Sequence, residues 1–173
     1  MIFYAPLEAL IVMLLTLPIL IKAIQRRKRG TQLIAAIVFM AYITIAAKYF
    51  FFPIMFDTAS FQASGINLEL VPILPLVEQA KNMGTVFFCK QVCGNVLAFV
   101  PITFLGAMNY KTLRTLKDCT IFAVTISCGI ELIQLIINLV TTIPNRAVSI
   151  NDVVLNSLGG MLGYLCWATI LHV

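Results

Sequence analysis

One carboxylate and two amide side chains interrupt the apolar run 119–140, namely Glu131, Gln134 and Asn138. Their spacing of three and then four residues places them on one face of a helix. A carboxylate in such a run has to be protonated, paired or exposed to water, because an unpaired charge in hydrocarbon costs about 2.5 kcal/mol or more. This face is therefore a candidate functional surface.

A second polar group opens the next apolar run, where Asp152 and Asn156 lie one helical turn apart. Asp152 is also well placed to cap this helix or to interact with the positive end of its dipole. Arg146 lies in the loop between the two runs. It is the obvious cation for Glu131 or Asp152, and its planar guanidinium group suits a carboxylate or a phosphate.

Asn95 lies near the outer end of an earlier apolar run, at a depth in the membrane similar to that of the residues named above. Polar groups from three helices and one loop thus converge on one side, which predicts a polar pocket opening toward the outer leaflet. The predicted ligand-binding residues are Asn95, Glu131, Gln134, Arg146, Asp152 and Asn156.

Purely structural roles remain open for each of these residues. Glu131 and Arg146 could form a buried ion pair that only fixes the register of the helices. Asp152 could be a plain N-cap, and Asn95 and Asn156 could be interhelical hydrogen-bond partners.

Known catalytic and cofactor motifs are absent from the sequence. The single histidine, His172, excludes a Ser-His-Asp set near the polar cluster and a paired-histidine metal motif. Glu131 and Asp152 could act as acid and base, but two carboxylates alone are a weak signal. We expect no metal and no cofactor.

Composition indicates the elements that must position these residues. Of 173 residues, 61% are apolar and only 11% are charged, which is too few charges to cover a surface exposed to water. The prediction is an all-α integral membrane protein, a polytopic bundle of about five transmembrane helices in a single domain, 1–173. The predicted helices are 2–24, 31–53, 85–108, 119–140 and 152–172, each long enough to cross about 30 Å of hydrocarbon.

The segment 54–84 is predicted to be an ordered outer loop. Pro72 and Pro75 oppose a long helix there, although a short interfacial or re-entrant helix would fit. Gly159, Gly160 and Gly163 lie in the last helix, and the spacing of the first and third permits close helix contact. These three glycines are interpreted as packing residues.

The net charge of +5 arises largely from two basic clusters beside apolar runs. Arg26–Arg29 and the loop with Lys111, Arg114 and Lys117 fall on the same side, so the positive-inside rule predicts an outer N-terminus and an inner C-terminus. No basic face interleaved with aromatic residues is present, which argues against a nucleic-acid partner. A multi-pass cell-membrane protein in contact with lipids is expected, in an oligomeric state left open.

Three sequence elements resemble those of the VanZ-like family. Gly94-Asn95 with Phe99 and Pro101 resembles its G-N-x-x-x-F-x-P element, and Glu131 with Gln134 its E-x-x-Q element. The R…D-x-x-x-N-x-x-G-G-x-x-G element is matched by Arg146, Asp152, Asn156, Gly159, Gly160 and Gly163. A looser match, Asn67-Leu68 with Pro72, resembles the N-L-x-P-F segment.

This resemblance implies a multi-spanning protein of the Gram-positive cell envelope. The family's namesake confers resistance to teicoplanin, a lipid-tailed glycopeptide, and is thought to reduce antibiotic binding at the cell surface. Combined with the predicted pocket, this favours an amphiphilic anionic envelope molecule or a lipoglycopeptide as the partner. Two alternatives stay open: an intramembrane enzyme that acts on a lipid-linked precursor through Glu131 or Asp152, and a structural scaffold.

Overall fold

The computed structural model describes residues 21, 30–55 and 67–171 of the chain. Four of its helices are long and apolar enough to cross a membrane: α2 (Gly30–Phe51), α4 (Thr85–Asn109), α5 (Leu116–Thr141) and α6 (Ile150–Leu171). They match the predicted helices 31–53, 85–108, 119–140 and 152–172 to within three residues at each end. The predicted helix 2–24 lies almost entirely outside the described residues.

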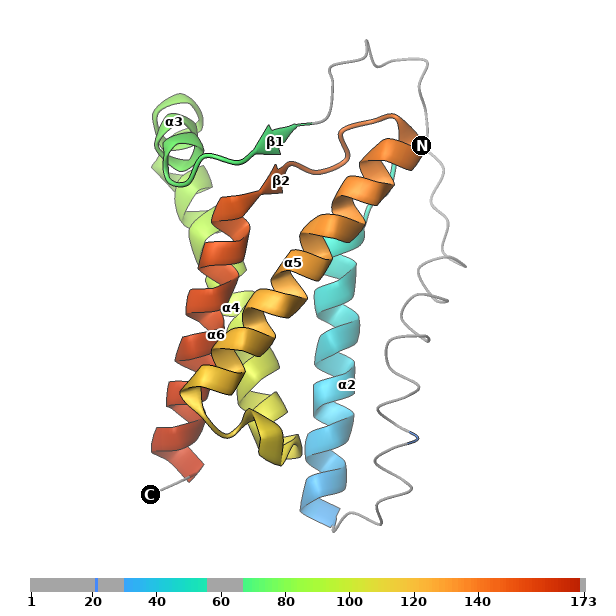
Figure 1. Ribbon diagram of the computed structural model, residues 1–173, viewed down its shortest axis with the longest axis vertical. Coiled ribbons are helices and arrows are strands. Elements are labelled where there is room, and N and C mark those ends of the chain that lie inside the picture. Colours follow the sequence, from blue (N-terminus) through green and yellow to red (C-terminus); the bar gives the residue numbers. More distant parts are fainter. Residues whose placement is uncertain (1–20, 22–29, 56–66, 172–173) are drawn as a thin grey trace.

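The long helices form a bundle in which α6 packs against α4 and α5, while α2 packs against α4 (Figure 1). One end carries the parallel strands β1 (Leu68–Glu69) and β2 (Val148–Ser149) and the helix α3 (Leu74–Met83). We call it the strand end. The opposite end carries the 3-10 helix η1 (Lys111–Leu113) and the last turn of α6, and we call it the η1 end.

The segment that was predicted to be an outer loop is partly regular. Residues 67–84 form β1 and α3, whereas residues 56–66 are not described. Proline does not prevent α3, because Pro75 lies in its first turn, where a backbone N–H has no helical partner to lose. The helix packs against α4, so a short helix does fold here. Its interfacial position stays a prediction.

Contact between α6 and its neighbours depends on residues without side chains. A Cβ added to Gly159 would collide with the carbonyl oxygen of Val96 in α4, and one added to Gly163 with that of Val100. Gly160 faces α5 instead. Pro101 lies inside α4 without ending it. The glycines let the backbones of α4 and α6 touch, and this contact fixes the position of the first turn of α6 relative to α4.

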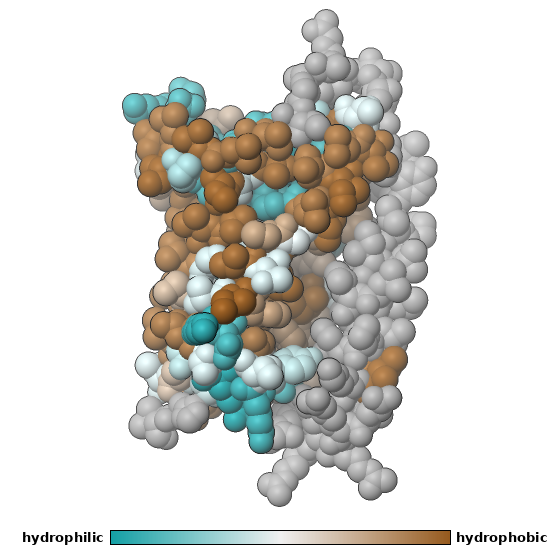
Figure 2. Space-filling view, viewed as in Figure 1, coloured by the Kyte–Doolittle hydropathy of each residue, from teal (hydrophilic) through white to brown (hydrophobic). Residues whose placement is uncertain are grey.

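Hydrophobic residues cover much of the described surface between the two ends, and hydrophilic residues gather at the η1 end and on α3 (Figure 2). Leucine, isoleucine and valine side chains of every long helix are exposed, such as Ile45, Leu97, Val140 and Ile170. The interior combines a hydrophobic core, with Phe50, Phe99 and Ile102, and buried polar side chains. On α5 the buried polar residues include Ser127, Glu131, Gln134 and Asn138, so the predicted polar face is the buried face of this helix. Apolar residues outside and polar residues inside are what a lipid environment favours.

Candidate functional site

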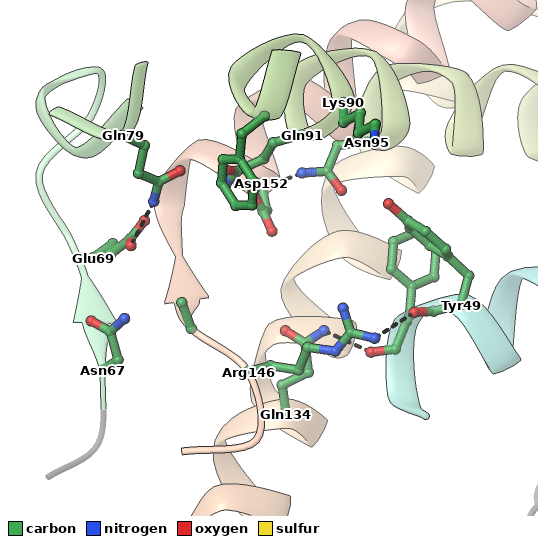
Figure 3. Close-up of a pocket in the computed structure, with 13 residues that line it drawn as sticks. Tyr49, Asn67, Glu69, Gln79, Lys90, Gln91, Asn95, Gln134, Arg146 and Asp152 are labelled. Atoms are coloured by element: carbon green, nitrogen blue, oxygen red, sulfur yellow. Dashed lines mark hydrogen bonds between the residues drawn. The ribbon is translucent and has the colours of Figure 1, made fainter. Parts of the chain in front are cut away.

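A cavity of about 420 Å³ lies at the strand end (Figure 3). All four long helices contribute to its wall, together with α3, the segment that forms β1, and the loop between α5 and α6. The residues that line it are Tyr49, Phe50, Asn67, Glu69, Gln79, Phe87, Lys90, Gln91, Asn95, Gln134, Arg146, Ala147 and Asp152.

Arg146 and Gln134 are held at the C-terminal end of α2. The Nη2 of Arg146 donates to the carbonyl oxygens of Tyr49 and Phe52, both at 3.0 Å. The amide of Gln134 donates to the carbonyl of Phe50 at 3.0 Å. The last four carbonyls of a helix have no partner within the helix, and a cation there also interacts favourably with the helix dipole. The end of α2 therefore fixes both side chains at the cavity.

Asn138 positions Arg146 through the backbone. Its Nδ2 donates to the carbonyl of Arg146 at 2.7 Å, and its Oδ1 accepts from the backbone N–H of Arg146 at 3.4 Å. Asn138 is buried, with 1% of its surface exposed. Sequence reasoning placed Asn138 on the polar face of its helix but did not include it among the site residues. Its role here is to fix the loop that presents Arg146.

Asp152 points into the cavity from the first turn of α6. Its Oδ1 accepts from the Nδ2 of Asn95 at 2.8 Å, which joins α6 to α4. The cap of α6 is made by Ser149 instead, because its hydroxyl accepts from the backbone N–H of Asn151 at 3.2 Å. Of the two roles that were open for Asp152, the plain N-cap is wrong.

Glu131 does not meet Arg146, so the ion pair that was one open alternative is absent from the described part of the chain. Glu131 is buried, and its Oε2 accepts from the backbone N–H of Ser149 at 2.7 Å. Both ionic side chains thus bind backbone groups at the ends of elements, where such groups otherwise lack partners. Glu131 does not line the cavity.

Asn156 also lies outside the cavity lining. Its Nδ2 donates to the hydroxyl of Ser127 at 2.8 Å, and both side chains are almost completely buried between α6 and α5. Four of the six predicted site residues therefore line one cavity: Asn95, Gln134, Arg146 and Asp152. Whether they bind a ligand stays a prediction.

Sequence reasoning missed the wall formed by Glu69 and Gln79. The pairing of Glu69 with Ser149 in the two-stranded sheet brings this segment next to the start of α6. No local signal indicates that pairing, because the partners are far apart in the chain. Gln91 was also missed, although it precedes Asn95 by one helical turn and so shares its face.

Several acceptor atoms at the cavity have no hydrogen-bond partner in the described structure. Glu69 accepts from the Nε2 of Gln79 at 3.1 Å through Oε1, and this leaves Glu69 Oε2 and Gln79 Oε1 unpaired. Gln134 Oε1 is also unpaired, although only 6% of the Gln134 surface is exposed. Buried polar atoms are normally paired. Asn151 Nδ2 and Asn156 Oδ1 are unpaired too but belong to residues outside the cavity lining, whereas these three acceptors belong to residues that line it.

The arrangement suits recognition of a polar group more than acid–base chemistry. Glu69 and Asp152 supply negative charge, and Lys90 and Arg146 supply positive charge, to one cavity. Glu131, the second carboxylate of the possible acid–base pair, is bonded elsewhere. Within the described residues, no three of the side-chain types His, Cys, Asp and Glu group in a way that could hold a metal ion.

Comparison with known proteins decides the family. The family model described as VanZ/LLP1 matches residues 33–171, which is most of the chain. The chain belongs to the VanZ/LLP1 family. No curated protein and no solved structure gave a significant match. Together with its four long apolar helices, this membership makes it a VanZ-like membrane protein.

In each VanZ-like sequence element, some residues line the cavity and others hold the backbone around it. In the first element, Gly94 leaves room for the hydroxyl of Tyr49, which would lie 2.8 Å from an added Cβ, and Asn95 faces the cavity. In the second, Gln134 lines the cavity and Glu131 holds the backbone of β2. Each VanZ-like element thus pairs a cavity residue with a residue that shapes its surroundings.

Proposed function

We propose that this VanZ-like protein binds the polar head group of an amphiphilic, anionic envelope molecule in the strand-end cavity. Bound in this way, it reduces the binding or access of teicoplanin-type lipoglycopeptides at the cell surface. The observation that carries the proposal is the buried Gln134, whose unpaired amide oxygen lines a cavity that also contains Lys90 and Arg146. A buried acceptor beside two cations fits a head group that offers both N–H or O–H donors and an anion.

The cations are available to an anionic group. Lys90 is exposed, and it makes no hydrogen bond or ion pair with another described residue. Both carbonyls that Arg146 binds accept from its Nη2. The N–H groups on Nε and Nη1 therefore have no hydrogen-bond partner among the described residues. Charge-assisted hydrogen bonds from such groups are about twice as strong as neutral ones.

The surroundings of the cavity suit the apolar part of an amphiphile. Tyr49 and Phe87 line it and are 50% and 44% exposed, respectively. The next residue before Phe87 on α4, Val86, is 70% exposed. A head group held in the cavity could therefore leave its tail on the apolar surface of α2 and α4, in contact with lipid.

The proposal places the strand end on the outer side of the membrane. Lys111, Arg114 and Lys117 lie at the η1 end, and clusters of basic residues favour the cytoplasmic side. The cavity would then face the compartment in which the cell wall is assembled and where glycopeptides act.

The test compares Lys90→Gln with Lys81→Gln in a Gram-positive host, at matched protein abundance. Lys81 is an exposed lysine of α3 at the same end of the molecule, but it does not line the cavity. Loss of a charge-assisted hydrogen bond costs about 1.5–3 kcal/mol, so binding should weaken by at least about tenfold. We expect Lys90→Gln and Arg146→Ala to lower the teicoplanin concentration that the cells tolerate, and Lys81→Gln to leave it unchanged.

Unchanged resistance in both Lys90→Gln and Arg146→Ala would contradict the proposal. If the variants instead lower the abundance of the protein in proportion to resistance, the polar residues only stabilise the bundle, as the scaffold hypothesis requires. Turnover of a lipid-linked precursor by the purified protein, seen as a mass change in extracted lipid, would support the enzyme hypothesis.

A further inference from the structure

Resting on this binding function, we propose that the cavity prefers a head group whose anionic group is joined to a primary ammonium, that is, a zwitterionic head group, over one that carries the anionic group alone. An anionic group of the ligand lies beside Lys90 and Arg146. A primary ammonium group lies a few bonds away and donates to the wall formed by Glu69 and Gln79. The ligand class is therefore an amphiphile whose phosphate or carboxylate is linked to a primary amine.

Glu69 and Arg146, whose charges are opposite, lie on different sides of the cavity. Figure 3 shows Glu69 and Gln79 on one side, and Tyr49 and Arg146 on the other. Figure 3 also shows Asp152 between Glu69 and Arg146. A ligand with a single charge would satisfy only one side, whereas a zwitterion satisfies both.

The acidic side lacks a cation of its own. Glu69 forms no ion pair with any described residue, and its Oε2 is buried without a hydrogen-bond partner. The adjacent Gln79 Oε1 is likewise unpaired. A primary ammonium carries three donors and no acceptor, which matches the two unpaired acceptors of this wall, Glu69 Oε2 and Gln79 Oε1. Leaving a buried carboxylate oxygen unpaired is costly, so a ligand that supplies the donor gains that energy on binding.

The acidic wall is held in place before any ligand binds. Glu69 pairs with Ser149 in the parallel sheet, and the backbone N–H of Val148 donates to the carbonyl of Asn67 at 3.0 Å. At the start of α3, the backbone N–H of Ile73 donates to the Oδ1 of Asn151 at 2.7 Å. These contacts tie the wall to the first turn of α6. A fixed wall loses little conformational entropy on binding, which favours specificity.

The same argument excludes a quaternary ammonium as the preferred group. Choline has a positive charge but no N–H, so Glu69 Oε2 and Gln79 Oε1 would stay without donors. Sites built to hydrogen-bond a donor discriminate strongly against an analogue that lacks it, because the buried acceptors remain unpaired. Discrimination between a primary and a quaternary amine is thus the signature of this wall.

The experiment measures lipid binding by native mass spectrometry, using the full chain in nanodiscs. The probes are phosphatidylethanolamine, phosphatidylcholine, phosphatidylglycerol and N-acetyl phosphatidylethanolamine. We expect phosphatidylethanolamine to bind at least about tenfold more tightly than the other three, from one charge-assisted hydrogen bond. Glu69→Gln should abolish this preference, and Gln79→Ala should weaken it. Glu78→Gln is the matched control, because Glu78 is an exposed carboxylate of α3 that does not line the cavity.

The outcomes separate this inference from the function on which it rests. Equal binding of all four lipids, still weakened by Lys90→Gln, would overturn the ammonium site and leave the anionic site standing. A preference for phosphatidylethanolamine that Glu69→Gln does not alter would also overturn it. If Lys90→Gln has no effect on any lipid, the proposed function fails instead.

A further arm identifies the source of the amine. Soluble phosphoethanolamine carries the same two charges without acyl chains. Displacement of the lipid by this molecule at millimolar concentration would support a free head group as the ligand. Failure to displace it, with the preference among the lipids retained, would support a membrane-embedded ligand. Both results support the ammonium site.

Discussion

The glycine contact and the strand-end cavity lie along the same helix, α6, and differ in how closely α6 approaches its neighbours. At Gly159 and Gly163 the backbones of α6 and α4 touch, and no side chain fits between them. About two turns before Gly159, Asp152 borders a cavity of about 420 Å³ with unpaired acceptors in its wall. The first region has no room for a ligand, and the second has room and unused hydrogen-bonding capacity.

Between these two regions lie polar residues that belong to neither. Glu131 and Asn156 are buried, and each bonds to a neighbouring element, at Ser149 and Ser127 respectively. Asn156 Oδ1 is unpaired, but Asn156 does not line the cavity. Burial and polarity alone therefore do not distinguish residues that stabilise the fold from residues that line the cavity. The distinguishing property is a polar atom without a partner beside an open volume.

The largest expected effect is on the glycine contact. Gly159→Ala and Gly163→Ala should each lower the free energy of unfolding by about 2 kcal/mol or more, because the added methyl group meets backbone atoms of α4 that cannot rotate away. Unfolding in a dodecyl sulfate titration measures this change. Gly129→Ala is the control: nothing lies within 4 Å of its added Cβ, so it should be neutral or slightly stabilising. Equal stability of all three variants would contradict the close contact.

A smaller loss of unfolding free energy is expected on substitution of Glu131, if this residue stabilises the fold and binds no ligand. Glu131→Ala leaves the backbone N–H of Ser149 unpaired, which should cost about 1–3 kcal/mol of unfolding free energy. Glu131→Gln keeps an acceptor and should cost much less. Lipid binding by the folded fraction of Glu131→Gln should match that of the wild type in the same nanodisc assay. A loss of binding without a loss of stability would move Glu131 into the site.

The smallest effect is expected for the pair Asn156 and Ser127. Hydrogen bonds between membrane helices are worth about 0.5–1 kcal/mol, so a double-mutant cycle with Asn156→Ala and Ser127→Ala should give a coupling energy of that size. The free energies of unfolding of the four proteins supply the cycle. Strict additivity would show that the bond stabilises nothing, and the contrast with the cavity residues would then be weaker.

Much of the site was predictable, because it depends on local periodicity. Glu131, Gln134 and Asn138 share a face by spacing alone, and the structure buries that face. Asn95 and Asp152 were expected at similar depth, and they hydrogen-bond to each other. These predictions needed only the rise and twist of a helix and the cost of polar groups in lipid.

The partners of Arg146 were not predictable in the same way. Charge alone suggested Glu131 or Asp152, but the guanidinium group donates to carbonyls at the end of α2. That helix end lies more than ninety residues away in the chain. The last carbonyls of a helix have no partner within it and so accept from a nearby donor, and the sequence gives no sign of which helix end will lie nearby.

The four long helices, the polar face of α5 and the glycine stripe of α6 follow from the amino-acid pattern, because hydrophobicity and helical spacing are local properties. Which polar atoms are paired depends on how distant segments pack. The two-residue sheet brings Glu69 and Gln79 to the cavity, and the ends of α2 and β2 take up Arg146 and Glu131. Hydrogen-bond donors and acceptors act over about 3 Å, so their pairing depends on packing between segments far apart in the chain.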